Sequence, residues 1–566
     1  MNSELVADVV IIGGGSCGAV LAARLSEDQD LQVCLMEAGG EDERWFVDVP
    51  LALALTVPTR LFNWAFLTEP QPGLAGRRGY QPRGKGLGGS SSINAQIYIR
   101  GHAVDYDHWA ALGNPGWSWA EVLPYFRRAE HNERFVDEFH GQGGPLNVAD
   151  IRSPNAFSRQ IIEAAVAQGL PRTEDFSGAQ DEGVGWYQVT QKGGERCNVS
   201  RAYLGRPGVP GSARNRQNLQ VLTNARALRL TLDGKRATGA ICDIKGTRVQ
   251  VKARREVIVC AGALQTPQLL MLSGIGDPEV LSAVGVATAV ALPGVGRNLQ
   301  DHIDCALAYR RKAPGLFGLG TGLGPQGWTA WREYREQRRG MFSSNVNESG
   351  AFVRTLPGLP APDVQMVFAH ALSDNHGRTP RAGSGFAGHV CVLRPHSVGR
   401  VTLASADPLA APSIDPAFLS DERDLETLLR GVKLIKRIFE SPMLHAGRPV
   451  PLFDEPLDTD DDLRQFIRRH ADTLYHPVGT CRMGRDAMAV VDAKLRVHGM
   501  TGLRIVDCSV MPTVPGGNTN APAVMIAEKA AEFIRDDLRA PLIGSVSQTE
   551  STHTNHTQLP SDELVP

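Results

Sequence analysis

The chain has 566 residues, which corresponds to two or three domains and excludes a small module held together by metal ions or disulfides. Its 59 lysines and arginines almost balance its 61 aspartates and glutamates, and the resulting net charge of −2 argues against a nucleic-acid-binding protein. Hydrophobic residues make up 42% of the chain and charged residues 21%, which is ordinary for a globular protein.

The cysteines and the apolar runs indicate the compartment. Nine cysteines are scattered from Cys17 to Cys508 without a C-x-x-C pair, so we expect no disulfide framework, no metal site and a reducing compartment. The first residues lack a basic segment and a cleavage site, and no apolar run approaches the ~20 residues of a membrane span. We therefore expect a cytoplasmic protein. The apolar run 49–57 predicts a buried loop or lid, and a peripheral contact with the inner membrane stays open.

The N-terminal residues have the pattern of a βαβ unit. The β-branched run 7–12 predicts a buried strand, residues 19–27 favour a helix, and the apolar run 31–37 predicts a second strand. A glycine-rich turn joins the first strand to the helix, and an acidic residue ends the second strand. This order of strand, turn, helix and strand is typical of a dinucleotide-binding fold.

Gly13, Gly15 and Gly18 form the motif G-x-G-x-x-G in that turn. The first glycine permits a tight turn, the second lets a pyrophosphate approach the backbone, and the third allows the helix to pack closely on the strand. The N-terminus of the helix offers free N–H groups to phosphate. Glu37 follows 19 residues after Gly18, where an acid binds ribose hydroxyls and repels the 2′-phosphate of NADP. We therefore predict a bound adenine dinucleotide, whose identity this motif alone leaves open.

Beyond this unit the chain alternates loops, strands and helices without an internal repeat, and we assign residues 303–470 to a second domain. The expected elements, in chain order, are extended loops over 41–83, a glycine- and serine-rich loop over 84–101, a helix over 154–170, strands over 218–230 and 247–263, a helix from 266, a polar loop over 294–302, a strand over 503–512, a helix over 521–534 and a disordered tail over 541–566.

Four separated segments resemble the signatures of the glucose–methanol–choline (GMC) oxidoreductases. They are GKGLGGSSSINAQIYIRGHAVDYD at 84–107, GALQTPQLLMLSGIG at 262–276, YHPVGTCRMG at 475–484 and GGNTNAPAVMIAEKAAEFI at 516–534. They keep the family's order and, with the N-terminal motif, span residues 7–534. Within the family the chain is most similar to the bacterial FAD-dependent alcohol, choline and sorbose dehydrogenases. The segments most similar to aliphatic alcohol dehydrogenases are 63–66, 187–192 and 344–352.

The resemblance implies an α/β chain, α+β overall, with a Rossmann-like FAD-binding domain and a substrate-binding domain built on a mostly antiparallel sheet. The implied division gives 1–150, 215–302 and 471–540 to a discontinuous FAD-binding domain, and 151–214 and 303–470 to the substrate-binding domain. Some members of the family link FAD covalently through a histidine. Ile93 stands at the matching position here, and an aliphatic side chain cannot form that bond, so we predict non-covalent FAD.

The resemblance also assigns residues around the flavin. Ala227 matches the position whose backbone holds the adenine, and Asp507 and Cys508 match the end of the last Rossmann-like strand. Asn94 can offer hydrogen bonds to polar atoms of the flavin, and the helix from Ala521 would point its positive end at the ring. The expected cofactor-binding residues are Gly13, Gly15, Gly18, Glu37, Ala38, Trp64, Gly84, Gly88, Ser91, Asn94, Ala95, Ala227, Ala261, Asp507, Cys508, Asn518 and Thr519.

Oxidising an alcohol removes a proton from its oxygen and a hydride from its carbon, and flavin N5 accepts the hydride. His476 matches the general base of the family, and histidine suits this role because its pKa lies near neutrality. Asn520 matches the second active-site position, and we expect its amide to orient the alcohol oxygen. The remaining histidines are expected to be ordinary, although His370 or His389 could face the substrate pocket; these are His302, His370, His389 and His396.

The resulting hypothesis is the oxidation of a primary aliphatic alcohol to the aldehyde, with electrons passed to a quinone or another acceptor rather than to oxygen. Alternatives in the family are a choline, polyol or sorbose dehydrogenase, or an alcohol oxidase. A choline site needs an aromatic cage, to which Trp64 and Trp328 could contribute, but aromatic residues make up only 6% of the chain. From a different class, the fold hosts flavin-containing lyases and a fatty-acid photodecarboxylase, which would not need His476 as an alcohol base. The oligomeric state is left open.

Overall fold

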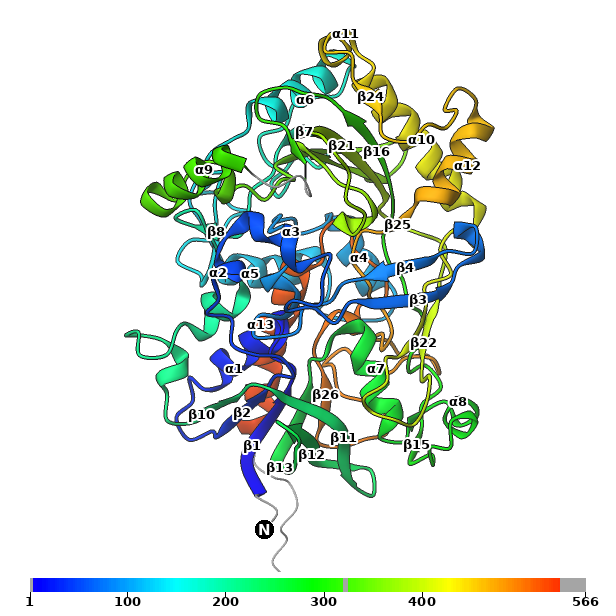
Figure 1. Cartoon of the computed structure of the whole chain (residues 1–566). Helices are drawn as coiled ribbons and strands as arrows, with labels where there is room; N and C mark the ends of the chain where they lie inside the picture. Colours follow the sequence, from blue (N-terminus) through cyan, green and yellow to red (C-terminus); the bar gives the residue numbers. More distant parts are fainter. Residues whose placement is uncertain (1–3, 319–323, 540–566) are drawn as a thin grey trace, which may run out of the picture.

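This computed structural model of the chain describes residues 4–318 and 324–539. The tail that we predict to be disordered, 541–566, lies outside the described residues. Two β-sheets lie at opposite ends of the molecule, with loops and short helices between them (Figure 1). This arrangement confirms the expected combination of a Rossmann-like unit and a second unit.

The lower sheet in Figure 1 is built around β1 (Glu4–Ile12), which pairs in parallel with β2 (Val33–Met36) and β13 (Thr247–Val259). The strand order is β10–β2–β1–β13–β12–β11, and β26 pairs with the carboxyl end of β13. The other strands are β10 (Leu219–Leu222), β11 (Ala225–Asp233), β12 (Arg236–Ile244) and β26 (Leu503–Ile505). Residues 9–12 of β1 are buried apolar side chains, as a parallel strand covered on both faces requires.

Beside this sheet, α13 (Asn520–Arg539) packs against both α1 (Ser16–Leu25) and α5 (Trp119–Ala129). The helix α1 begins directly after the glycine-rich turn, as its sequence predicts. A further helix, α7 (Gly262–Leu272), follows β13 and contacts β11. The helices α1 and α7 therefore start directly after the carboxyl ends of β1 and β13.

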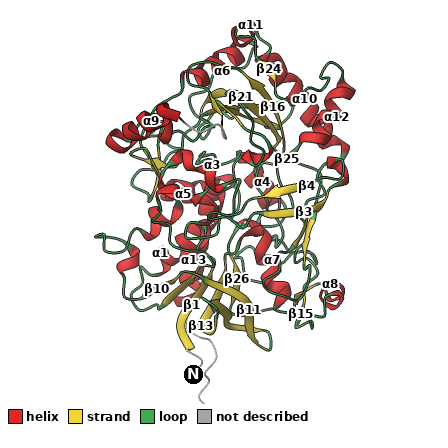
Figure 2. Ribbon diagram, viewed as in Figure 1, coloured by secondary structure: helices red, strands yellow, loops and turns green. Residues whose placement is uncertain are grey.

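The upper sheet has the order β20–β17–β21–β19–β18–β7, and β16 pairs with β21, β24 and β25. Its pairs are antiparallel except β17 with β20, which confirms a mostly antiparallel sheet. The helices α6 (Ala156–Ala167) and α10 (Glu422–Phe439) cover it (Figure 2). Its strands are β7 (Gly183–Trp186), β16 (Ile303–Arg310), β17 (Phe317–Gly318), β18 (Ser349–Val353), β19 (Val364–Ala369), β20 (Ala371–Leu372), β21 (Gly385–Val392), β24 (Val450–Pro451) and β25 (Asp472–Thr473).

The exact division of the chain into two domains stays a prediction. One stretch that we expected in the substrate-binding domain, 197–213, contributes buried side chains to the core of the lower sheet instead. Tyr203 explains part of this placement, because its hydroxyl donates to the Glu528 carboxylate on α13 over 2.7 Å. A short π-helix, Ser200–Leu204, carries Tyr203 to this position beside α1.

Residues 41–83, expected as extended loops, also contain short regular elements, whose lengths are too small for a periodic sequence pattern. The other helices and strands are α2 (Trp45–Asp48), α3 (Leu53–Thr56), β3 (Phe66–Pro70), β4 (Arg78–Gln81), α4 (Ala103–Ala111), β5 (Glu130–Asn132), β6 (Leu146–Val148), β8 (Gln191–Lys192), β9 (Glu195–Arg196), β14 (Ile275–Gly276), α8 (Pro278–Ala283), β15 (Val290–Ala291), α9 (Gly324–Gln337), β22 (Arg400–Thr402), β23 (Ser413–Asp415), α11 (Pro442–His445) and α12 (Asp460–His470).

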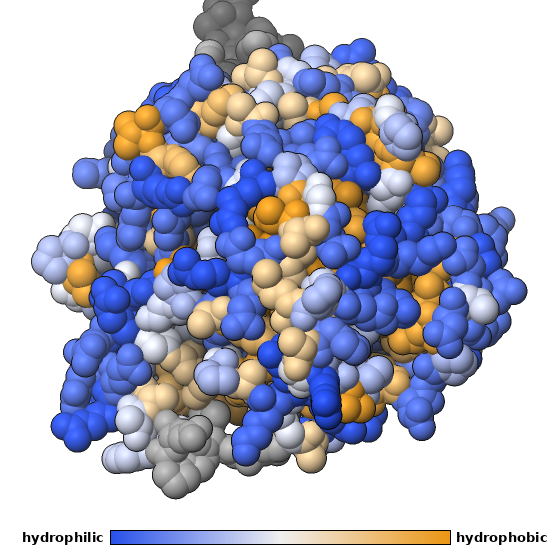
Figure 3. Space-filling view, turned by 90° about the horizontal axis from the view of Figure 1, so that it is seen from above, coloured by the Kyte–Doolittle hydropathy of each residue, from blue (hydrophilic) through white to orange (hydrophobic). Residues whose placement is uncertain are grey.

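The surface seen from above is mostly hydrophilic, with hydrophobic residues in smaller groups between the polar ones (Figure 3). Within residues 4–318 and 324–539, none of the helices combines the length and the apolar character that crossing a membrane requires.

Candidate active site

Residues of both sheets line a cavity of about 920 Å³. The carboxyl ends of β1, β2 and β13 contribute Ile12, Met36 and Cys260. The opposite wall comes from alternating residues of β16, β19 and β21, which share one face of the upper sheet. These residues are Asp304, Ala306, Ala308, Val367, Ala369, Ala387 and His389. The carboxyl ends of parallel strands are where α/β sheets bind ligands, so the cavity is the candidate active site.

Most of the residues singled out in the sequence line this cavity. They are Gly13, Gly15, Glu37, Ala38, Trp64, Gly84, Asn94, Ala95, Ala227, Ala261, His476, Asp507, Cys508, Asn518, Thr519 and Asn520. Segments far apart in the chain therefore meet around one space.

Gly18, Gly88 and Ser91 are not among the residues that line the cavity; they support the turns around it, and their role in cofactor binding stays a prediction. A Cβ at Gly18 would lie 1.8 Å from the Gly13 carbonyl oxygen, so only glycine allows α1 to approach the turn. The Gly88 N–H donates to Gly14 O over 2.8 Å. The Ser91 hydroxyl donates to Gly88 O over 2.6 Å, and the adjacent residues of the same turn, Gly89 and Ser90, face the cavity instead.

Glu37, the acid expected to bind ribose hydroxyls, lies in the cavity wall beside the glycine-rich turn. The Glu37 carboxylate accepts from the Gly14 N–H over 2.8 Å and from the Gly39 N–H over 2.7 Å. Burial raises the pKa of Glu37, and these two backbone donors oppose the rise. The Gly86 N–H acts as a third backbone donor, and since a carboxylate offers about four acceptor positions, about one remains for a ribose hydroxyl. A Cβ at Gly13 would lie 2.4 Å from Cys260 O, which restricts this turn to glycine.

A chain of hydrogen bonds determines the tautomer of His476. Its first link joins His302 Nε2 to the Leu393 carbonyl oxygen over 3.1 Å, and because a carbonyl only accepts, His302 carries its proton on Nε2. His302 Nδ1 is then an acceptor, and it lies 2.9 Å from His476 Nδ1, which must donate. His476 Nε2 is therefore left with a free lone pair, and Asn518 Nδ2 approaches it at 3.2 Å.

The orientation of Asn518 agrees with this assignment, because its Oδ1 accepts from Gln365 Nε2 over 3.2 Å and its Nδ2 is left to face His476. Burial, His302 and Arg83 lower the pKa of His476 well below its ordinary value. His476 is only 8% exposed, and its imidazole is neutral at physiological pH. It is thus a neutral base with the lone pair of Nε2 available.

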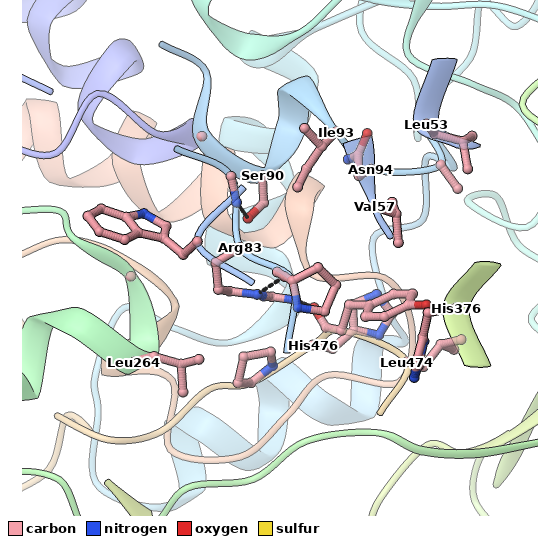
Figure 4. A pocket seen from close by; sticks show the side chains of 18 of the residues that line it. Leu53, Val57, Arg83, Ser90, Ile93, Asn94, Leu264, His376, Leu474 and His476 are labelled. Carbon is pink, nitrogen blue, oxygen red and sulfur yellow. Dashed lines mark hydrogen bonds between the residues drawn. The ribbon is translucent and has the colours of Figure 1, made fainter. Parts of the chain in front are cut away.

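The backbone around His476 is fixed by its neighbours. Tyr475 has a φ of 74°, in the left-handed region that non-glycine residues seldom adopt. Its carbonyl oxygen accepts from Arg83 Nη2 over 2.7 Å, and the His476 N–H donates to Asp301 Oδ1 over 2.8 Å. Figure 4 shows Arg83 and His476 close together in the cavity wall. Arg83 was not among the residues predicted from the sequence, although it directly precedes the glycine- and serine-rich segment.

Asn520 and Asn518 make different contacts at the start of α13. Asn520 Oδ1 accepts from the Ser16 hydroxyl over 2.7 Å, which ties the start of α13 to the glycine-rich turn. The residue that approaches His476 is Asn518, two positions earlier. Both side chains line the cavity, and the expected role of Asn520 in orienting the alcohol oxygen stays a prediction.

Two of the histidines expected to be ordinary belong to the site. His302 orients His476, and His389 faces the cavity from β21, where its Nδ1 lies 2.7 Å from Asp304 Oδ2. Burial lowers the pKa of His389, but the Asp304 carboxylate outweighs it and raises the pKa above its ordinary value. Within the described part of the chain, the other oxygen, Asp304 Oδ1, is buried without a hydrogen-bond partner. His370 lies elsewhere, with its Nδ1 3.1 Å from the Ser158 hydroxyl.

One end of the cavity reaches the surface, since Arg78, Asn375 and Arg378 both line it and are exposed. His376 belongs to the same segment and connects it to the base: its Nδ1 lies 2.5 Å from the Tyr475 hydroxyl and its Nε2 3.0 Å from Asp472. Figure 4 shows His376 on the side of Leu53 and Val57, away from Leu264. The predicted lid segment 49–57 thus contributes to the wall at the entrance.

Comparisons with known proteins agree with this architecture. Two family models, both described as GMC oxidoreductase, match residues 7–304 and 395–527. An alcohol dehydrogenase [acceptor] of Pseudomonas putida is 42% identical over 93% of this chain and 95% of its own length. An oxygen-dependent choline dehydrogenase of Chromohalobacter salexigens is 41% identical over 93% of this chain and 94% of its own length.

Solved structures show the same fold. Pyridoxine 4-oxidase from Mesorbium loti superposes with a TM-score of 0.82 at 33% identity, covering 94% of this chain and 99% of that one. An FAD-dependent oxidoreductase from Chaetomium thermophilum superposes with a TM-score of 0.84 at 26% identity, covering 94% and 100%. These relatives and the residues around the cavity support FAD as the cofactor. The chain therefore belongs to the GMC oxidoreductase family.

Proposed function

We propose that this GMC oxidoreductase oxidises a primary alcohol to the aldehyde, with His476 as the general base. The observation that carries the proposal is the hydrogen-bond chain from Leu393 O through His302 to His476, which leaves the His476 Nε2 lone pair unprotonated. When bound, FAD accepts the hydride from the alcohol carbon. The protein must then receive the hydroxyl proton, and a neutral imidazole is suited to that step.

Asn518 supports the same step from the other side of Nε2. Its Nδ2 lies 3.2 Å from His476 Nε2, so an alcohol oxygen that lies beside both nitrogens can accept from the amide and donate to the imidazole. A donor aimed at the oxygen stabilises the negative charge that develops as the proton leaves. When His476 has taken up the proton and is charged, its Nδ1–H still donates to His302 Nδ1, so His302 keeps the His476 ring in place.

The shape of the opposite wall supports an aliphatic substrate. Its inward-facing residues include four alanines and a valine, namely Ala306, Ala308, Ala369, Ala387 and Val367. Small apolar side chains leave room for an alkyl chain and offer it no polar partner. We propose that electrons leave to a quinone or another acceptor, as the printed name of the Pseudomonas putida relative suggests for that protein.

A second candidate substrate is a cationic alcohol such as choline. Asp304 in the cavity wall favours it, because its carboxylate places a negative charge near a bound ammonium group. The aromatic cage expected for such a substrate has less support. The ring of Trp64 already contacts two cations of the protein, since Lys85 Nζ lies 4.5 Å and the Arg226 guanidinium 5.2 Å from its centroid. Trp328 does not line the cavity and is 73% exposed.

Anaerobic mixing of the holoenzyme with single alcohols tests the proposal. Loss of flavin absorbance with primary alkanols, and much slower loss with choline, would support the aliphatic substrate. The reverse order would support the cationic one, and readmitting air would separate an oxidase from a dehydrogenase. If no alcohol bleaches the flavin, alcohol oxidation is wrong, and the lyase and photodecarboxylase alternatives become the better candidates.

Non-covalent FAD is a separate proposal. Ile93 lines the cavity and is 3% exposed, and its aliphatic side chain has no atom that could be the nucleophile of a flavin link. Acid precipitation should therefore release all the flavin into the supernatant. Flavin that stays with the precipitated chain would contradict this proposal.

A further inference from the structure

Arg196 at the end of β9 is a buried cation without a carboxylate partner among the described residues. Its side chain is 2% exposed, and burial alone lowers its pKa to about 9. Its Nε donates to Val47 O over 3.0 Å, and its Nη1 lies 3.1 Å from Ser91 O and 2.8 Å from Asn94 O. Buried arginines are normally paired with an acid, so this neutral set of acceptors requires an explanation.

Arg196 also fixes the side chain of Asn94, which lines the cavity although Arg196 does not. Asn94 Oδ1 accepts from Arg196 Nη1 over 2.8 Å and from the Gln96 N–H over 3.0 Å. Two donors thus hold the amide oxygen on the protein side. No acceptor among the described residues takes the Asn94 Nδ2 protons, so the NH₂ end is the one left for a ligand.

The backbone of the same turn depends on Arg196 as well. Ser91 O and Asn94 O lie at, and just beyond, the carboxyl end of the short 3₁₀ turn Gly89–Ser92. Carbonyls at the end of a helical turn lack partners within it, and a cation stabilises them. Gly89 and Ser90 of this turn line the cavity opposite the glycine-rich turn, and a Cβ at Gly89 would lie 2.7 Å from Gly15 Cα. Arg196 therefore supports a turn that has little freedom to move.

We propose that Arg196 is a positioning residue for bound FAD, which holds the NH₂ group of Asn94 toward the flavin and supplies a buried positive charge behind it. The first part predicts tighter FAD binding, and the second predicts that the protein favours the reduced flavin, which gains negative charge. The proposal rests on FAD as the cofactor and does not depend on the alcohol that the enzyme oxidises.

The test compares Arg196→Met, Asn94→Leu and the double variant, using FAD binding to the apoprotein and the midpoint potential of the bound flavin. Arg196→Met should weaken FAD binding roughly tenfold to a hundredfold, as expected for lost hydrogen bonds from a charged donor. Each tenfold loss in the preference for reduced over oxidised flavin lowers the two-electron potential by about 30 mV. Since Arg196 acts through Asn94 in binding, the two effects on FAD affinity should not add.

Two further variants keep the test informative. Arg504→Met is the matched control, because Arg504 is 2% exposed, is paired with Glu256 over 2.6 Å and does not line the cavity. It should lower the unfolding temperature while the midpoint potential stays unchanged. If Arg196→Met does not fold, Arg196→Lys, which keeps the charge but not the fork of donors, should retain the potential and lose affinity.

The proposal is overturned if Arg196→Met lowers only the unfolding temperature. In that case the FAD affinity stays within twofold of the wild type, and the midpoint potential stays within a few millivolts of it. Strictly additive losses of affinity in the double variant would overturn the action through Asn94. Neither measurement uses an alcohol, so a failure of the proposed alcohol oxidation would leave these results, and their meaning, unchanged.

Discussion

Replacing His302 by phenylalanine perturbs the hydrogen bond that defines His476 as a base. The change keeps a planar ring at a position that is 0% exposed, but it removes the acceptor of the His476 Nδ1–H, now 2.9 Å away. The tautomer of His476 with its proton on Nε2 is then no longer disfavoured. In that tautomer the nitrogen beside Asn518 cannot accept the alcohol proton.

The size of the effect follows from the cost of the lost partner. A buried donor without an acceptor costs about 1–3 kcal/mol. Since about 1.4 kcal/mol corresponds to a factor of ten in a rate, we expect the plateau rate of flavin reduction to fall roughly tenfold to a hundredfold. KM should change less, because His302 does not line the cavity. Removing His302 also removes an influence that lowers the pKa of His476, so the acid limb should move to higher pH.

The assay is anaerobic stopped-flow reduction of the flavin by a primary alcohol, measured across the pH range. His370→Phe is the control, because His370 is also buried, at 1% exposed, but is bonded to Ser158 away from the cavity. The reasoning is refuted if His302→Phe retains the wild-type plateau rate within twofold, or if the control loses as much.

Four further variants test other parts of the structure. Arg83→Met removes a cation that lowers the pKa of His476, so the pKa should rise and the acid limb of the rate profile should move to higher pH; an unchanged limb would contradict this. Asn518→Leu should slow flavin reduction roughly tenfold to a hundredfold, because a donor to the developing negative charge is lost. Asn520→Leu should mainly weaken FAD retention. If Asn520→Leu slows flavin reduction more than Asn518→Leu does, Asn520 is the residue that orients the alcohol oxygen. Glu528→Gln removes the buried carboxylate that two partly buried arginines contact, which should destabilise the fold by about 3 kcal/mol and lower the unfolding midpoint, with the rate unchanged.

Local geometry explains why part of the site could be predicted from the sequence. The turn at Gly13 and the acid at Glu37 depend on a few adjacent residues, and both lie where the sequence predicts them. His476 and the cavity-lining residues of the signatures followed from the family resemblance. The mostly antiparallel second sheet was also expected from that resemblance. Its strands come from segments that lie far apart in the sequence, so no local pattern predicts how they pair.

The sequence predicts less well where the path of a loop decides which side chain points inward. Asn518 and Asn520 are both in a Gly/Asn segment, and only the conformation before α13 selects the one that reaches His476. Likewise, the 3₁₀ turn Gly89–Ser92 turns Ser90 rather than Ser91 toward the cavity. Spacing along the sequence cannot distinguish neighbours within such turns.

Long-range pairing accounts for the residues that the sequence did not indicate. His389 reaches Asp304 because β16 and β21 are neighbouring antiparallel strands, with Ala306 opposite His389. His302 reaches His476 across 174 residues of sequence. These contacts follow from strand order in the second sheet, which no local pattern in the chain specifies.

The central claim is that His476 removes the alcohol proton, and the rate of anaerobic flavin reduction in His476→Ala tests it most directly. The variant should bind FAD normally and be reduced by dithionite, but a primary alcohol that bleaches the wild-type flavin should bleach it roughly 10²- to 10⁴-fold more slowly. Bleaching of the variant at the wild-type rate, with full FAD content, would contradict the account.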